Sequence, residues 1–227
     1  MDKNEFENPK ETSRIEAFSD GVFAIAITLL ILEIHVPAAT DKETLLSSLL
    51  HEWTSFLALL IGFFTLLVCW INHHYMFTMI HKSNSVLLLL NGFKLLVVTI
   101  TPFATALLAK NIQTNWEAAA VSAYGFNFAL MGCAMTGIWL YAKRQGFIKT
   151  DSERKLQAAT RLYIFASLFS TFIWIMSYIS LIGCLVLFCL MFAIFVFPER
   201  MVSLQLNRAV KHQKMPLPVY DALQQNS

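Results

Sequence analysis

The sequence has little charge. Asp, Glu, Lys and Arg make up 14% of its 227 residues, whereas soluble domains contain about 25%. Hydrophobic residues make up 56%, so most of the chain is expected to lie in lipid. Because a membrane-spanning helix needs about 20 mainly apolar residues, the length accommodates about six spans and no large soluble domain.

Other features that are missing exclude further classes. The formal net charge is only +2 and the basic residues are scattered, which argues against a nucleic-acid partner. The 4 cysteines lie in apolar runs without a CxxC pair, which is typical of reduced packing residues. Nucleotide-binding, metalloprotease and GxSxG signatures are missing, as is a TVGYG-type carbonyl filter. We therefore expect neither an enzyme nor a resident cofactor.

Long apolar segments are present along nearly the whole chain, and they predict an all-α, polytopic membrane protein. The expected spans cover residues 14–34, 53–77, 85–108, 116–141, 158–176 and 181–197. Together they form one transmembrane domain over residues 1–200, followed by a polar tail over residues 201–227. Ser13 and Glu16 have the spacing of a capping box at the start of the first helix.

The distribution of lysine and arginine predicts the orientation. With six spans both ends of the chain share one side of the membrane, and nearly all loop and tail basic residues fall on that side. Only Lys42 and Lys110 fall on the other side. The positive-inside rule then places both termini in the cytoplasm.

Asp20 is an ionisable residue within the first span, where a charge is costly without a partner or water. Lys94 and His73 or His74 lie on the same side of the membrane and could form a buried network with it. The alternatives to a structural network are a proton relay and a location of Asp20 among the lipid headgroups. A metal site or haem protein using His73, His74 or His81 has less support, because adjacent helical histidines point about 100° apart.

The second half of the first span has one regular stripe. Ile25, Thr28, Leu29 and Leu32 recur at the spacing that places side chains on one face of a helix. By the same spacing, Asp20 points away from Ile25. The pattern alone is typical of side chains that contact lipid or a neighbouring helix.

One short motif resembles a known family. Arg14, Phe18, Ser19 and Asp20 match the RxxxFSD signature of the transmembrane protein 175 family, the lysosomal potassium channel and its bacterial homologues. The resemblance extends to Lys94, to the six-span layout, and to the end of the second span, where the matching residues are Trp70, His73, His74 and Phe77.

The resemblance implies a function and an assembly. The first helices of a homotetramer in a prokaryotic plasma membrane would surround a pore that conducts K⁺ passively, with Ile25 at the constriction and Thr28, Leu29 and Leu32 along its wall. K⁺ would be the permeant ion, and membrane lipids the other partners. The resemblance also implies a structural network that holds the pore helix, made of Arg14, Phe18, Ser19, Asp20, His73, His74 and Lys94.

A proton-coupled secondary transporter is the main rival interpretation. It would use Asp20, Lys94 and the histidines to bind or relay protons. Transporters of this kind usually show inverted repeats or broken helices near the middle of the membrane, and the sequence shows neither pattern apart from Pro102 in the third span.

Overall fold

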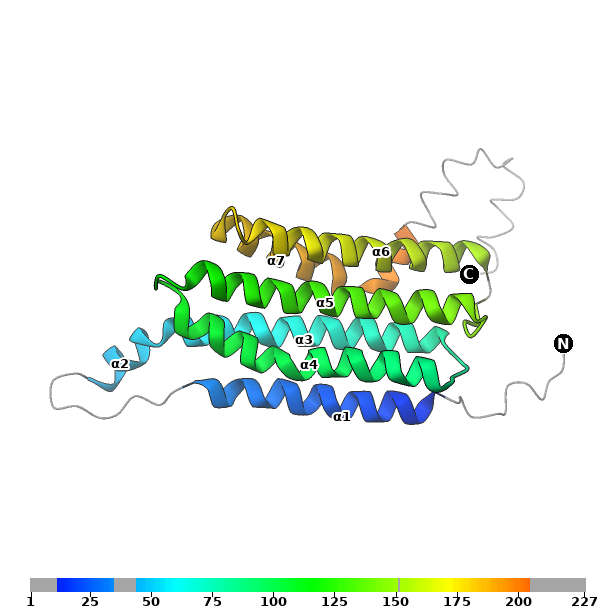
Figure 1. Cartoon of the computed structure of the whole chain (residues 1–227), viewed down its shortest axis with the longest axis horizontal. Helices are drawn as coiled ribbons and strands as arrows, with labels where there is room; N and C mark the ends of the chain where they lie inside the picture. Colours follow the sequence, from blue (N-terminus) through cyan, green and yellow to red (C-terminus); the bar gives the residue numbers. More distant parts are fainter. Residues whose placement is uncertain (1–11, 35–43, 151, 205–227) are drawn as a thin grey trace, which may run out of the picture.

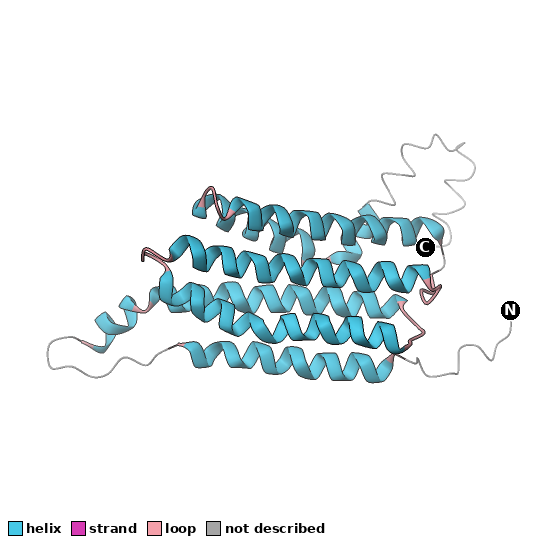
Figure 2. Cartoon of the chain, in the orientation of Figure 1, coloured by secondary structure: helices cyan, strands magenta, loops and turns pink. Residues whose placement is uncertain are grey.

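The computed structural model describes residues 12–34, 44–150 and 152–204 (Figure 1). The described part is helical, and its only β-type pairing is an isolated bridge between Ile80 and Ile148 (Figure 2). The helices are α1 (Ser13–Leu29), the short 3₁₀ helix η2 (Leu30–Glu33), α2 (Leu45–His51), α3 (Trp53–Met79), α4 (Ser85–Asn111), α5 (Glu117–Arg144), α6 (Glu153–Met176) and α7 (Leu181–Phe195).

The lengths and apolar character of these helices fit a membrane protein. Five of them can span a membrane, counting α1 together with η2. A sixth span is formed if Val186–Phe195 of α7 and the bent segment Pro198–Leu204, which turns by 77°, are taken as one unit. The predicted all-α, polytopic fold is therefore confirmed. Most of the predicted tail, residues 205–227, lies outside the described residues.

The start of α1 differs from the prediction. The residue that precedes the helix is Thr12, and Ser13 already belongs to the first turn, so the capping box predicted on Ser13 is wrong. The hydroxyl of Thr12 donates to Oε1 of Glu16 at 2.7 Å and lies 3.2 Å from the carbonyl oxygen of Ile80. Thr12 takes this place because its hydroxyl reaches both the first turn of α1 and the connection between α3 and α4.

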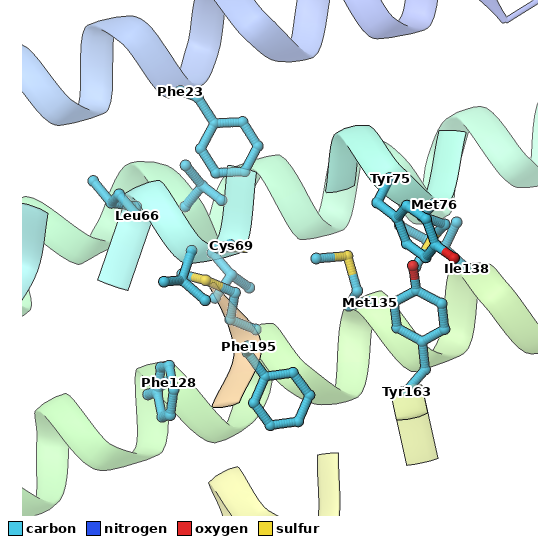
Figure 3. Close-up of a cluster of buried hydrophobic side chains, with 14 of the residues drawn as sticks. Phe23, Leu66, Cys69, Tyr75, Met76, Phe128, Met135, Ile138, Tyr163 and Phe195 are labelled. Atoms are coloured by element: carbon cyan, nitrogen blue, oxygen red, sulfur yellow. The ribbon is translucent and has the colours of Figure 1, made fainter. Parts of the chain in front are cut away.

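The helices pack as a bundle with α1 along one edge (Figure 1). α1 packs against α3 and α4, α5 packs against α4 and α6, and α7 packs against α6 and α3. Figure 3 shows part of the apolar core, with Phe23 of α1, Cys69 of α3, Phe128 of α5 and Phe195 of α7. The core therefore joins α3 to the far half of the bundle, and α1 contributes only its inward face to it.

Hydrogen bonds between side chains and neighbouring helices fix this packing. The hydroxyls of Thr65 on α3 and Tyr124 on α5 are 2.8 Å apart. Asn72 on α3 donates to the carbonyl oxygen of Phe195 at the end of α7, also at 2.8 Å. Bonds of this kind between membrane helices contribute about 0.6 to 2 kcal/mol each, so they set the register of the helices more than they drive association.

Two connections are paired at the end of the bundle where α1 begins. The amide of His81 donates to the carbonyl of Phe147, and the amide of Lys149 donates to the carbonyl of Met79, each at 2.9 Å. This pairing surrounds the Ile80–Ile148 bridge. The α3–α4 and α5–α6 connections are thereby joined to each other, and Thr12 joins the start of α1 to them.

Candidate functional site

The two long faces of α1 differ in burial. The face toward α3 and α4 is buried and includes Ile15, Phe23 and Ala26. On the opposite face, Ile25 is 62% exposed and Leu32 73% exposed. An apolar residue in a soluble protein would be covered at such positions, but in a membrane protein this face meets lipid or another subunit.

The four residues that the resemblance assigns to a constriction are all exposed, with Ile25, Thr28 and Leu29 on α1 and Leu32 on the adjoining η2. Ile25, Leu29 and Leu32 are exposed apolar side chains. Thr28 is also exposed, and its hydroxyl donates to the carbonyl oxygen of Ile25 at 2.9 Å. Phe18, 65% exposed, continues the same stripe toward the start of the helix.

Small residues lie within this stripe and beside it. Ala17, Gly21 and Ala24 are all exposed, and a Cβ atom added at Gly21 would meet nothing within 4 Å. Small residues let the backbones of two membrane helices approach closely. This side of α1 is therefore suited to packing against a helix that the single chain does not supply.

Ser19 anchors the buried face of α1 to α4. Its hydroxyl donates to the carbonyl oxygen of Ile15 at 2.7 Å and accepts a hydrogen bond from Nδ2 of Asn91 at 3.0 Å. Ser19 and Asn91 are both buried. Asn91 was not among the predicted site residues, although its position one helical turn before Lys94 places the two polar residues on the same face of α4.

Asp20 bonds to a residue that was not expected as its partner. Its Oδ1 accepts a hydrogen bond from Nε1 of Trp70 on α3 at 2.8 Å. Trp70 in turn stacks on the ring of His74, with the ring centroids 6.0 Å apart and the planes 28° apart. Both Asp20 and His74 are exposed in the single chain, so this contact lies at the surface of the bundle.

Lys94 and His73 lie deeper, around the ring of Phe23. Lys94 is fully buried, and its Nζ is 4.0 Å from the centroid of that ring. His73, 1% exposed, lies 5.8 Å from Phe23 and 4.5 Å from Phe77 between ring centroids. Among the described residues, neither Lys94 Nζ nor either ring nitrogen of His73 has a hydrogen-bond partner.

The predicted network thus divides into two environments. Ser19, His73 and Lys94 are buried between α1, α3 and α4, whereas Asp20 and His74 flank Trp70 at the surface. Arg14 is exposed in the first turn of α1. In the described ranges no three His, Cys, Asp or Glu side chains gather closely enough to hold a metal ion. The role of the network in holding the pore helix stays a prediction.

Comparisons with known proteins place these features in a family. The family model described as endosomal/lysosomal potassium channel TMEM175 matches residues 14–102, from α1 into α4. A potassium channel from Chamaesiphon minutus is 46% identical over 134 residues, which are 58% of this chain and 66% of that protein. A potassium channel from Streptomyces collinus is 37% identical over 139 residues, 61% of this chain and 68% of that protein.

The similarity extends to a vertebrate protein and to a solved structure. The human endosomal/lysosomal proton channel TMEM175 is 37% identical over 125 residues, which cover 50% of this chain and 25% of the human protein. The crystal structure of a homologue of the lysosomal potassium-selective channel TMEM175, from Chamaesiphon minutus, superposes with a TM-score of 0.71 and 36% identity, over 86% of this chain and 98% of that one. The resemblance seen in the sequence is confirmed, and this multi-pass membrane protein belongs to the TMEM175 family.

Proposed function

We propose that the chain is a subunit of a potassium-selective channel that conducts K⁺ passively through an apolar constriction formed by α1. The observation that carries this proposal is the exposed stripe of Ile25, Thr28, Leu29 and Leu32 on a helix at the edge of the bundle. The bacterial relatives named as potassium channels support the choice of ion. The site requires no cofactor, and the proposed location is a prokaryotic plasma membrane.

The proposed assembly is a homotetramer with one α1 from each subunit around a central axis. The bulky stripe would face the axis, and the small residues Ala17 and Ala24, offset to one side of it, would pack against the neighbouring subunit. At about 100° per residue, Ala17 and Ala24 lie about 80° and about 100° from Ile25 around the helix, whereas Gly21, about 40° from Ile25, lies within the stripe. The buried face, held by Ser19 and Asn91, would keep each α1 fixed to its own subunit.

An apolar constriction can conduct and select without a carbonyl filter. A ring of Ile25 side chains would exclude water when narrow and pass an ion only after part of its hydration shell is removed. K⁺ loses water at a lower energetic cost than Na⁺, so K⁺ would be favoured, and a divalent ion would be excluded by its stronger hydration.

Ion flux into proteoliposomes tests this proposal. Purified wild-type protein is expected to pass K⁺ faster than Na⁺, and Ile25→Asn is expected to pass both at similar rates because the ring becomes polar. Ile100→Asn is the matched control, since Ile100 is also an exposed isoleucine, 42% exposed, but lies on α4. Unchanged selectivity in Ile25→Asn, or an equal loss in both variants, would contradict the apolar constriction.

A second candidate is proton transport, including the proton-coupled exchange considered from the sequence. Its support is the buried pair of Lys94 and His73, which have no hydrogen-bond partner in the described part of the chain, together with vertebrate relatives named as proton channels. Two results would favour this function over passive K⁺ conduction. The ion flux would saturate and require a pH gradient, and it would be lost in His73→Phe but not in Ile25→Asn.

A further inference from the structure

A groove runs along the seam between α3 and α7, away from α1's exposed stripe. Its first part is a hollow of about 450 Å³ lined by apolar side chains, among them Leu60, Phe64 and Phe192. Its second part is a hollow of about 280 Å³ that adjoins the first, because Val196 and Phe197 line both. The two adjoining hollows are together called the groove.

The second hollow lies at the end of the helices and adds polar and charged groups to a mostly apolar lining. These groups come from His74 and Thr78 of α3 and from Glu199 and Arg200 of the segment that follows α7. That segment, Pro198–Leu204, turns away from α7 by 77°, so the groove is apolar along the helices and acquires charged side chains at the bend. Such a gradient matches an amphipathic molecule with its tail in the membrane and its headgroup at the surface.

The charges at the polar end are of both signs. The guanidinium of Arg200 lies 4.8 Å from the centroid of the Phe197 ring, which holds it over the groove. The carboxylate of Glu199 lines the same hollow. A phosphate would pair with Arg200 but would meet repulsion from Glu199, unless the ligand also supplies a cation.

We infer that the groove binds a phospholipid with an aminoethyl headgroup, of the phosphatidylethanolamine class. Its phosphate would accept hydrogen bonds from Arg200, and its ammonium group would donate to Glu199. One acyl chain would lie against Leu60, Phe64 and Phe192. An anionic glycerol headgroup leaves Glu199 without a cation, and a choline headgroup has no N–H to donate.

The groove is connected to α1 by one side chain. Trp70 lines the second hollow, and its Nε1 donates to Asp20 at 2.8 Å. Lipid binding would therefore hold the indole in the position that bonds Asp20. An effect on ion flux rests on the proposed channel function, whereas the lipid site itself does not.

Native mass spectrometry of the full-length protein tests the site without any measurement of flux. The protein is taken from nanodiscs that contain phosphatidylethanolamine, phosphatidylglycerol and phosphatidylcholine in equal amounts, and the retained lipids are identified by mass. We expect preferential retention of phosphatidylethanolamine. Arg200→Ala should reduce its retention about tenfold, as expected for a lost charge-assisted hydrogen bond, and Arg200→Lys should restore part of it.

A substitution at Glu199 examines lipid specificity. Glu199→Gln removes the negative charge, so phosphatidylglycerol should be retained as well as phosphatidylethanolamine. Arg144→Ala serves as the control, because Arg144 is an exposed arginine at the end of α5 and does not line the groove. Circular dichroism of each variant establishes that it is folded.

Four results would overturn the proposal. The first is equal retention of the three lipids by folded wild-type protein. The second is an equal loss of phosphatidylethanolamine in Arg144→Ala and Arg200→Ala. The third is retention that occurs only after residues 205–227 are removed, which would assign the groove to the chain's own tail. The fourth is retention by dissociated monomers alone, which would assign the groove to a second copy of the chain.

Discussion

The contact between Lys94 and Phe23 allows a quantitative test of how α1 is held. The ammonium of Lys94 is fully buried and lies 4.0 Å from the ring centroid, well within the range of about 6 Å for a cation–π interaction. Desolvated pairs of this kind contribute about 2 kcal/mol. In the described structure this ring is the group that the ammonium contacts in place of a hydrogen-bond acceptor.

Replacing Phe23 with leucine should therefore cost more than lost packing. Phe23→Leu replaces the ring with a smaller aliphatic side chain, and a partial truncation of this kind in a core costs about 1 kcal/mol. With the lost cation–π term of about 2 kcal/mol added, it should lower the free energy of unfolding by about 3 kcal/mol. In a Lys94→Met background the same substitution should cost only about 1 kcal/mol. The coupling between the two positions is then about 2 kcal/mol.

Unfolding in mixed micelles with increasing dodecyl sulfate, followed by circular dichroism, measures all four proteins of this double-mutant cycle. Phe128→Leu is the control, since Phe128 is a buried core phenylalanine of α5 whose ring contacts Phe188. Phe128→Leu should lower the free energy of unfolding by the same amount with lysine or methionine at position 94. Additive effects of Phe23→Leu and Lys94→Met would refute the argument that the ring stabilises the ammonium.

Two further substitutions test the helix contacts. Trp70→Phe removes the N–H that Asp20 accepts and should cost about 1 kcal/mol in the same unfolding assay; no change would show that the bond contributes nothing net. Gly62→Ala would place its Cβ 2.7 Å from Oγ1 of Thr105. This contact forces α3 and α4 apart and should lower the free energy of unfolding by about 1 to 3 kcal/mol. Gly92→Ala is the control: its Cβ would meet nothing within 4 Å, so it should be neutral or stabilising.

The helices themselves could be predicted from the sequence because the membrane imposes their length. The expected span over residues 85–108 lies within α4, Ser85–Asn111, and Asn84 caps that helix by accepting from the amide of Leu87 at 2.9 Å. The boundary of α1 was predicted one residue late. Spacing alone does not show that the helix begins directly after Thr12, since Thr12 is held there by contact with Ile80, far along the chain.

The site was predictable only in part, for a different physical reason. Periodicity places Ile25 and Thr28 on one face of α1, but it does not say whether other helices of the chain cover that face. As an ionisable residue within a span, Asp20 predicts a charged partner, but its partner in the structure is Trp70, whose side chain has a single N–H donor. Because the indole N–H is uncharged, the sequence does not mark Trp70 as a partner of Asp20. The contact can be recognised only once the positions of α1 and α3 are known.

The paired connections at the start of α1 have a mechanical consequence. The Ile80 carbonyl is bonded to Thr12, while the backbone on either side of Ile80 is bonded to the α5–α6 connection. The first turn of α1 is thus linked by hydrogen bonds to both connections. A tilt of α5 and α6 would be transmitted through these bonds to the first turn of α1.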